Sequence, residues 1–435
     1  MTFRFVHTGD LHLDSPFVGL TGEAPPDVAQ TLREATIGAW DNVVDLALAE
    51  HVDFLLVAGD AFENANRTLR GQLAFRDGLA RLAAAAIPSF VVTGNHDPLD
   101  GWEPTVAWPE LAHRFEAHRV ASRPVIRDGE EIARVYGVSY HKRDVTTNLA
   151  RHFRREADAP FAIGLLHANV GGLEGAANYA PCSVGDLQAS GMDYWALGHI
   201  HRHHVVSVRR PTAVYCGNPQ GRDPGEADPR GCYLVTVDDA GRIHPEFRPA
   251  DVVRWQLIDV TIGELGSEEA LVDAVATAVD DARTAAGRSI VARVRLSGRG
   301  PLHTSLARTG LLDDVRAEAQ ERLGLAEPFA WIESMRDRTR PAVDLEARRR
   351  ADDFVGDLLR RLDATRRALA GDELGEDATV DGVPTAAEIH RVLDELYANQ
   401  RARRPLHDAR PDAARLAELL DEVEGILVDR LGGEA

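Results

Sequence analysis

This sequence carries FVHTGDLH at residues 5–12, FLLVAGD at 54–60, FVVTGNHD at 90–97, IGLLHAN at 163–169 and WALGHIH at 195–201. In each segment an apolar stretch with the length of a β-strand runs directly into Asp, Asn or His. Loops at the carboxyl ends of strands converge on one crevice in an open α/β sheet, so these polar side chains are expected to meet in space. The segments therefore predict one site built from distant parts of the chain.

The polar residues of these segments are of the types that bind divalent metals. Carboxylate, amide and imidazole ligands without thiolate suit Mn²⁺, Fe or Zn better than a structural zinc site of the cysteine type. A lone His after a strand is usually structural, but several such segments together favour a metal centre, and the set is large enough for two metals. The ligand pool is Asp10, His12, Asp60, Asn95, His167, His199 and His201, with His96 and Asp97 beside it.

In the order D-x-H, G-D, G-N-H-D, a lone H and G-H-x-H, the chain resembles the calcineurin-like metallophosphoesterases. The stretches TGDLHLDSPF (8–17) and AGDAFE (58–63) are more narrowly similar to SbcD-like nuclease subunits of bacterial double-strand-break repair exonucleases, in their YhaO-type branch. No catalytic motif position departs from the family pattern. The resemblance implies an α/β fold in which two sheets pack face to face with helices outside.

The resemblance also implies roles for the site residues. One metal is expected at Asp10, His12, Asp60 and His201. The other is expected at Asp60, Asn95, His167 and His199, so that Asp60 bridges the two. His96 is expected to contact the phosphate and protonate the leaving alkoxide, with Asp97 either orienting its imidazole or capping the loop. His141 is a weaker candidate for substrate contact, whereas His203 and His204 are expected to face solvent.

The composition is that of a soluble globular protein, with 44% hydrophobic and 27% charged residues, and 435 residues suffice for two or three domains. No apolar stretch approaches the roughly 20 residues that span a bilayer. The chain opens on a strand rather than a signal peptide, and its three cysteines lack C-x-x-C spacing, as is typical of reduced thiols. We expect a cytoplasmic protein with no membrane partner.

The formal net charge of −20 opposes tight autonomous binding to DNA, because such binding depends on Lys and Arg that release counterions. Bound divalent metals and a basic partner subunit would both offset this acidity. The charge therefore does not argue against phosphoester chemistry.

The pattern of apolar runs predicts three regions. Residues 1–250, which the resemblance identifies as a metallophosphoesterase (nuclease) domain, are expected to contain strands at 3–7, 54–58, 89–93, 132–138, 161–166, 194–198, 213–216 and 231–237 and helices at 28–50 and 67–85. Residues 251–340 read as a small α+β unit with strands at 255–262, 289–298 and 329–335 and helices from 267 and over 302–323. The resemblance implies that this unit is a capping domain beside the metal site.

Residues 341–435 are expected to be helical, with amphipathic stretches at 346–369, 385–400 and from 411 onward, and an acidic linker at 371–384. The resemblance implies that this region docks an ATPase partner. Intramolecular helix packing is the alternative explanation of the apolar stripes.

The leading hypothesis is a Mn²⁺-dependent DNA phosphodiesterase. It would be an exonuclease, with endonuclease activity left open, acting on DNA in repair together with an SbcC-like ATPase; a homodimer is also left open. The alternatives are a small-molecule phosphodiesterase or phosphatase and a non-catalytic interaction subunit. The extra domain and the helical region argue against the first alternative, and the complete set of ligands with His96 argues against the second.

Overall fold

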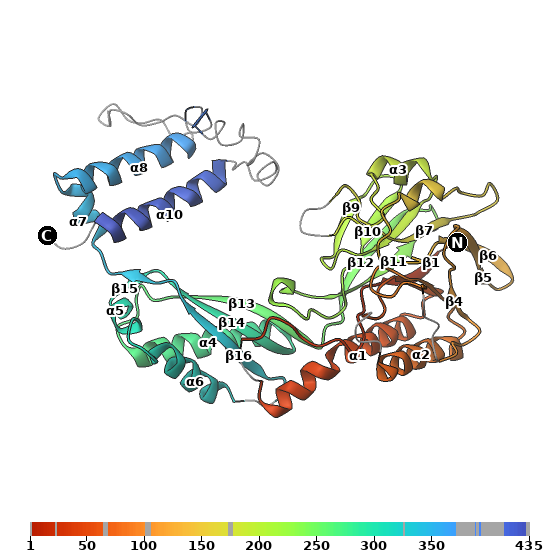
Figure 1. Cartoon of the computed structure of the whole chain (residues 1–435), viewed down its shortest axis with the longest axis horizontal. Coiled ribbons are helices and arrows are strands. Elements are labelled where there is room, and N and C mark those ends of the chain that lie inside the picture. The colour runs from red at the N-terminus through yellow and green to blue at the C-terminus, as the bar shows by residue number, and fades with distance from the viewer. Residues whose placement is uncertain are drawn as a thin grey trace. The chain divides into compact units, whose positions relative to one another are not determined.

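The structure is a computed structural model that describes residues 2–21, 24–63, 68–100, 106–172, 177–324, 327–370, 388, 391–392 and 413–431 (Figure 1). The chain forms two compact units. The first comprises Met1–Ile258, Val275–Val294 and Glu318–Met335, and the second comprises Asp259–Ala274, Arg295–Ala317 and Arg336–Ala435. All residues of the five sequence segments belong to the first unit.

Two six-stranded sheets dominate the first unit, and their orders are β12-β11-β1-β2-β3-β4 and β5-β6-β7-β8-β10-β9. The first sheet contains β1 (Phe3–Thr8), β2 (Phe54–Ala58), β3 (Ser89–Val92), β4 (Ala112–Arg114), β11 (Gly231–Val237) and β12 (Ile243–Pro249). The second contains β5 (Ala121–Arg127), β6 (Glu130–Gly137), β7 (Ala162–His167), β8 (Tyr194–Gly198), β9 (His204–Ser207) and β10 (Thr212–Tyr215). Central strands β1, β2 and β3 run parallel to one another, as do β6, β7, β8 and β10.

The two sheets pack face to face through alternate residues of their strands. Phe5 and Phe54 stack with ring centroids 4.8 Å apart, and Phe5 meets Tyr194 of the other sheet edge-to-face at 5.3 Å. Since successive side chains of a strand point to opposite faces, Val6 and Leu55 lie on the outer face of the first sheet. The predicted sandwich with helices outside is confirmed.

Helices α1 (Pro26–Ala49) and α2 (Leu69–Ala84) cover the outer face of the first sheet (Figure 1). Proline at the first turn of α1 suits a helix start, and the Thr68 hydroxyl caps α2 by accepting from Gly71 N at 2.9 Å. Trp40 of α1 is fully buried and donates from Nε1 to the Ala74 carbonyl at 3.2 Å. On the second sheet, α3 (Val184–Ala189) packs through Leu187 against an outer cluster that includes Trp195.

The sequence pattern found the central strands within two residues but missed β4, β5, β9 and β12. These four strands are the edges of the two sheets. An edge strand is paired on one side and largely solvated, so it lacks a long apolar run, and β5 and β12 contain proline. The helices and central strands were therefore predictable, whereas the edges were not.

Residues 253–337 contain a three-stranded sheet in the order β13-β14-β16, together with helices. Its elements are β13 (Val253–Thr261), α4 (Glu268–Ala286), β14 (Ser289–Ser297), α5 (Leu302–Leu306), α6 (Leu311–Leu323) and β16 (Ala330–Asp337). This is the predicted succession, except that the helix expected over 302–323 is broken into α5 and α6. In β14 the apolar residues Ile290, Ala292, Val294 and Leu296 are buried, as the alternation predicted.

The second unit ends in helices α7 (Leu345–Arg350), α8 (Phe354–Ala370) and α10 (Ala413–Leu431), and it also holds the short pair β15 (Arg299–Gly300) and β17 (Arg340–Pro341). The single helix predicted at 346–369 is interrupted, because Ala351 adopts an extended conformation. Helices α8 and α10 pack on each other through Leu359, Leu362 and Val428. The helix predicted at 385–400 and the linker at 371–384 lie outside the described residues, apart from 388 and 391–392.

Among the described residues, no helix combines the length and the apolar character that crossing a bilayer requires. All three cysteines are buried and free.

Candidate metal centre

The loops after β1, β2 and β3 lie side by side because these strands are parallel neighbours. Hydrogen bonds tie the first two loops together, from Asp10 N to Gly59 O at 2.9 Å and from His12 N to Asp60 O at 3.0 Å. The third loop joins them where His96 N donates to Asp60 Oδ1 at 2.8 Å. The strand order thus brings the D-x-H, G-D and G-N-H-D motifs to one edge of the sheet, as predicted.

Glycines allow the second sheet to approach the edge of the first sheet where these three loops meet. A Cβ atom on Gly198 would lie 2.0 Å from the Ala58 carbonyl oxygen, and one on Gly94 would lie 2.4 Å from Asp60 Oδ1 and 2.7 Å from His167 Nε2. No side chain fits in either gap. The glycine in each of these motifs is therefore required by the approach of the two sheets at the site.

Four site residues hold a left-handed backbone, with φ of 50° at Asp10, 43° at His12, 50° at Asp60 and 98° at His199. This region is uncommon for residues with a Cβ, and such conformations cluster at functional sites. Tight turns directly after the strands aim these side chains inward rather than along the chain.

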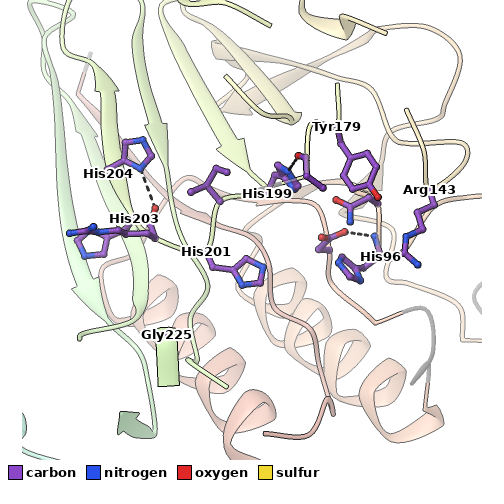
Figure 2. Close-up of a pocket in the computed structure, with 13 residues that line it drawn as sticks. His96, Arg143, Tyr179, His199, His201, His203, His204 and Gly225 are labelled. Carbon is purple, nitrogen blue, oxygen red and sulfur yellow. Dashed lines mark hydrogen bonds between the residues drawn. The ribbon is translucent and has the colours of Figure 1, made fainter. Parts of the chain in front are cut away.

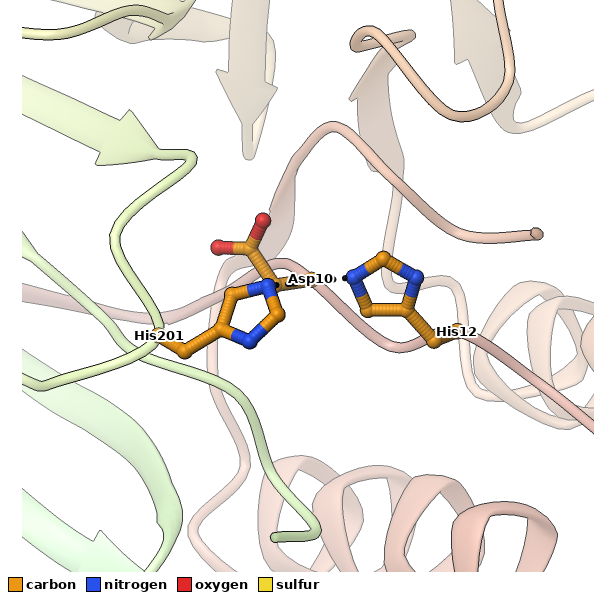
Figure 3. A group of neighbouring side chains, drawn as sticks. All are labelled: Asp10, His12 and His201. Carbon is orange, nitrogen blue, oxygen red and sulfur yellow. Dashed lines mark hydrogen bonds between the residues drawn. The ribbon is translucent and has the colours of Figure 1, made fainter. Parts of the chain in front are cut away.

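Asp10, His12 and His201 converge as a first group, although His201 comes from the second sheet (Figure 3). One ligand atom of each lies within 4.8 Å of the others, and the two Nε2 atoms of His12 and His201 are 3.2 Å apart. The Nδ1 of His201 lies 2.5 Å from Glu226 Oε1 and that of His12 lies 3.3 Å from Glu63 Oε2. Each imidazole thus has a carboxylate at Nδ1 and its Nε2 turned to the shared centre.

A second group joins Asp10, Asp60 and His167, again with ligand atoms within 4.8 Å of one another. His167 donates from Nδ1 to the Ala58 carbonyl at 2.9 Å, so Nε2 is the ring nitrogen that faces Asp60 and Asn95. That Nε2 lies 3.2 Å from Asp60 Oδ2 and 3.0 Å from Asn95 Oδ1. Asp10 is common to both groups.

His199 is placed differently from the other histidines of the pool. Its backbone N–H donates to both carboxylate oxygens of Asp10, at 3.1 and 3.0 Å, and its Nε2 lies 2.6 Å from the Ala177 carbonyl oxygen. Nε2 therefore carries the proton, and Nδ1 is the atom left for a metal. Burial lowers the pKa of His199 to about 4, so the imidazole is neutral.

The donor set fits divalent metals. The Nε2 atoms of His12 and His201 lie 3.2 Å apart beside the buried Asp10 carboxylate, which is close enough for one cation to be bound by all three side chains. Burial lowers the pKa of His12 to about 3, so its imidazole is in the neutral form that binds metals. Oxygen and imidazole donors without thiolate suit borderline or hard ions.

His96 lies at the edge of these groups and faces the cavity (Figure 2). Its Nδ1 lies 2.6 Å from Glu63 Oε1, which leaves Nε2 free. Burial would lower the pKa of His96, but the hydrogen bond to Glu63 and the nearby Asp60 carboxylate raise it above its ordinary value. These contacts favour the protonated form of His96, which is the form that a proton donor requires.

Asp97 was expected either to orient the His96 imidazole or to cap the loop. Its carboxylate is bound to the loop backbone and not to the His96 imidazole. Its carboxylate accepts three backbone N–H bonds, from Gly94 at 2.6 Å, Ala61 at 2.8 Å and Asp60 at 3.2 Å. It thereby fixes the G-D and G-N-H-D loops against each other. Glu63 orients His96 instead; the sequence signal was its place three residues after Asp60 in AGDAFE.

His201 of the first group and Asp60 of the second line a cavity of about 960 Å³. Besides site residues, its lining includes Arg143, Tyr179, Arg202, His203 and His204 (Figure 2). His203 and His204, which were expected to face solvent, are half-buried in this wall. His141 instead lines a separate cavity of about 350 Å³ with His118 and His152.

Comparison with known proteins gives the family of the chain. Residues 3–203 match the calcineurin-like phosphoesterase family, and residues 255–340 match the middle domain of the metallophosphoesterase YhaO. The chain is similar to the uncharacterized metallophosphoesterase YhaO of Bacillus subtilis, with 38% identity over 360 residues that cover 82% of this chain and 86% of the relative. The chain is a calcineurin-like metallophosphoesterase.

A DNA double-strand break repair protein and a nuclease subunit are similar to this metallophosphoesterase at lower identity. It is 29% identical to the DNA double-strand break repair protein Mre11 of Haloferax volcanii over 267 residues, 58% of this chain and 55% of the relative. It is 23% identical to SbcD of the Bacillus subtilis nuclease SbcCD over 300 residues, 60% of this chain and 70% of the relative. Membership of the family makes the protein a hydrolase of phosphoesters that uses divalent metal ions.

Proposed function

We propose that this metallophosphoesterase is a two-metal DNA phosphodiesterase of DNA repair. One observation carries the proposal: two ligand groups that share Asp10, together with the proton donor His96, lie beside a single cavity. The similarity to Mre11 and to SbcD supports DNA as the substrate.

In the proposed site Asp10, His12 and His201 would hold one metal, and Asn95, His167 and His199 would hold the other, with Asp60 available to both. Asp10 belongs to both proximity groups and would therefore be a second carboxylate available to both metals. Two divalent ions, Mn²⁺ by preference, would polarise a water and offset negative charge on the attacking and leaving oxygens.

His96 supplies the proton in the proposed reaction. As the bond between phosphorus and the leaving oxygen breaks, the proton on Nε2 passes to the departing alkoxide. Glu63 holds the opposite nitrogen, Nδ1, at 2.6 Å and stabilises the imidazolium before transfer. Asp97 keeps the loop that carries His96 in register with the Asp60 loop.

One assay tests the substrate class. Purified protein with Mn²⁺ is offered linear duplex DNA, single-stranded DNA and bis-p-nitrophenyl phosphate. Cleavage of DNA with a higher kcat/KM than the small ester supports the proposal. Cleavage of the small ester without cleavage of either DNA would make the protein a small-molecule phosphodiesterase.

Arg143 provides a prediction about polyanion binding. Arg143 and Arg202 line the cavity, and neither forms an ion pair with another described residue. We expect Arg143→Gln to weaken single-stranded DNA binding and to reduce the slope of log K against log salt by about 0.7, the value for one lost phosphate contact. Fluorescence anisotropy in a His96→Ala background, in which DNA cleavage is slowed, measures this slope.

Arg209 gives the matched control, because it is exposed but does not line the cavity. Arg209→Gln should leave the slope unchanged. Equal effects of the two substitutions would mean that Arg143 acts only through net charge.

The pair α8 and α10 is the proposed docking site for an SbcC-like ATPase. The inner face of α10 packs through Leu427 and Val428, while Val423 and Ile426 on the same helix are 40% and 48% exposed. Phe354 at the start of α8 is 71% exposed. Internal packing thus uses only part of the apolar surface of these helices.

We expect Val423→Gln with Ile426→Gln to abolish co-purification with a co-expressed SbcC-like ATPase while the melting temperature stays unchanged, since neither side chain is in the internal core. Glu422→Gln, an exposed neighbour on α10, serves as the control. A double variant that still co-purifies with the ATPase would contradict docking on this face.

A further inference from the structure

Glu226 has both carboxylate oxygens committed to fixed partners. Oε1 lies 2.5 Å from His201 Nδ1, and Oε2 accepts from Arg222 N at 2.7 Å and from Asn218 Nδ2 at 3.0 Å. The side chain is 15% exposed. Glu226 lies 25 residues after His201, in a loop rich in Gly and Pro, and no sequence motif pointed to it.

Arg230 holds the backbone around this contact. Its Nη1 donates to the His201 carbonyl at 2.6 Å and to Asn218 Oδ1 at 3.2 Å, and its Nε donates to the Glu226 carbonyl at 3.0 Å. Asn218 N also donates to the His201 carbonyl, at 3.1 Å. One network therefore fixes the main chain of His201, its imidazole and the carboxylate that faces it.

The contact with Glu226 at Nδ1 determines the state of the other ring nitrogen of His201, Nε2. With its Nδ1 proton donated to Glu226, His201 presents the Nε2 lone pair to His12 and Asp10. A carboxylate at this place fixes the tautomer and raises the basicity of the nitrogen that binds the metal. We propose that Glu226 is a positioning residue that sets metal affinity at the group of Asp10, His12 and His201. This inference rests on the ligand assignment proposed above.

Only a carboxylate satisfies all three partners of Glu226. A glutamine has one acceptor oxygen and one donor NH₂. If its oxygen faced His201, the NH₂ would face the N–H groups of Arg222 and Asn218; if turned round, the NH₂ would face the Nδ1 proton of His201. Glu226→Gln therefore keeps the shape of the side chain but cannot accept hydrogen bonds from His201, Arg222 and Asn218 at the same time.

The experiment is a Mn²⁺ titration followed by equilibrium dialysis and metal analysis, with full-length protein. Wild type should bind two ions per chain. Glu226→Gln should weaken one of the two sites by roughly 10–100-fold, the usual effect of removing such a partner, and leave the other unchanged. Glu246→Gln, on the exposed edge strand β12, is the matched control and should bind like wild type.

A second arm separates positioning from general damage. In a His201→Ala background, Glu226→Gln should cause no further loss of Mn²⁺, because Glu226 acts through His201. Two wild-type-like sites in Glu226→Gln, or an equal loss with and without His201, would overturn the inference. Fewer than two ions in wild type would instead overturn the two-metal assignment itself. If Glu226→Gln melts early, Asn218→Ala, which removes one donor to Glu226, should still weaken the same site.

Discussion

Asp60→Ala is expected to reduce hydrolysis of any phosphodiester to the uncatalysed background and to lower Mn²⁺ content below two ions per chain. Burial would raise the pKa of Asp60, but the neighbouring His167 imidazole lowers it below its ordinary range, so the carboxylate is ionised. Its Oδ2 lies 3.2 Å from His167 Nε2, at the centre of the ligand pool. Because Asp60 is the proposed ligand of both metals, removing its carboxylate should weaken metal binding by both ligand groups.

Metal analysis after Mn²⁺ reconstitution, together with turnover of bis-p-nitrophenyl phosphate, measures this result. Asp60 Oδ1 also accepts from His96 N at 2.8 Å, so Asp60→Asn is the better matched variant, because it retains an acceptor oxygen. Both variants should lose metal. Two Mn²⁺ per chain in either variant would show that another carboxylate, with Asp10 as the first candidate, bridges the metals.

His96→Ala is expected to keep both metals and to lose about 10²–10⁴-fold in kcat, the usual contribution of a general acid. Glu63 holds the imidazole and raises its pKa, whereas burial lowers the pKa of His199 and His203, which line the same cavity. The loss should be larger for a substrate with an alkoxide leaving group than for a nitrophenyl ester, because nitrophenolate departs without a proton.

Glu63→Gln provides the matched comparison for His96. It removes the charge that raises the His96 pKa while leaving the imidazole in place, so we expect an intermediate loss in kcat with the same dependence on the leaving group. If His96→Ala lost its metals, His96 would be a ligand. If turnover were unchanged with both leaving groups, the proton donor would lie elsewhere.

Local patterns predicted the buried centre of the fold and failed at its edges. Strands β2, β7 and β8 are buried along their whole length and β1 is buried except at Arg4, and the apolar runs that this burial requires are visible in the sequence. Edge strands such as β12, with its alternation of half-buried and exposed residues, resemble loops. The break between α7 and α8 was likewise invisible, because residues on both sides of it favour helix.

The sequence by itself determined which residue types could form the site. Every member of the ligand pool lies at the end of a strand or in the loop just beyond it, and strand ends that meet at one edge bring them together. The sequence could not assign partners to these residues. A hydrogen bond requires two atoms to be placed to within a few tenths of an ångström, and here the two atoms come from loops far apart in the chain. Only the tertiary structure placed Glu63 on His96, turned Asp97 to the backbone amides, and brought Glu226 to His201 across a loop whose sequence carries no metal-binding motif.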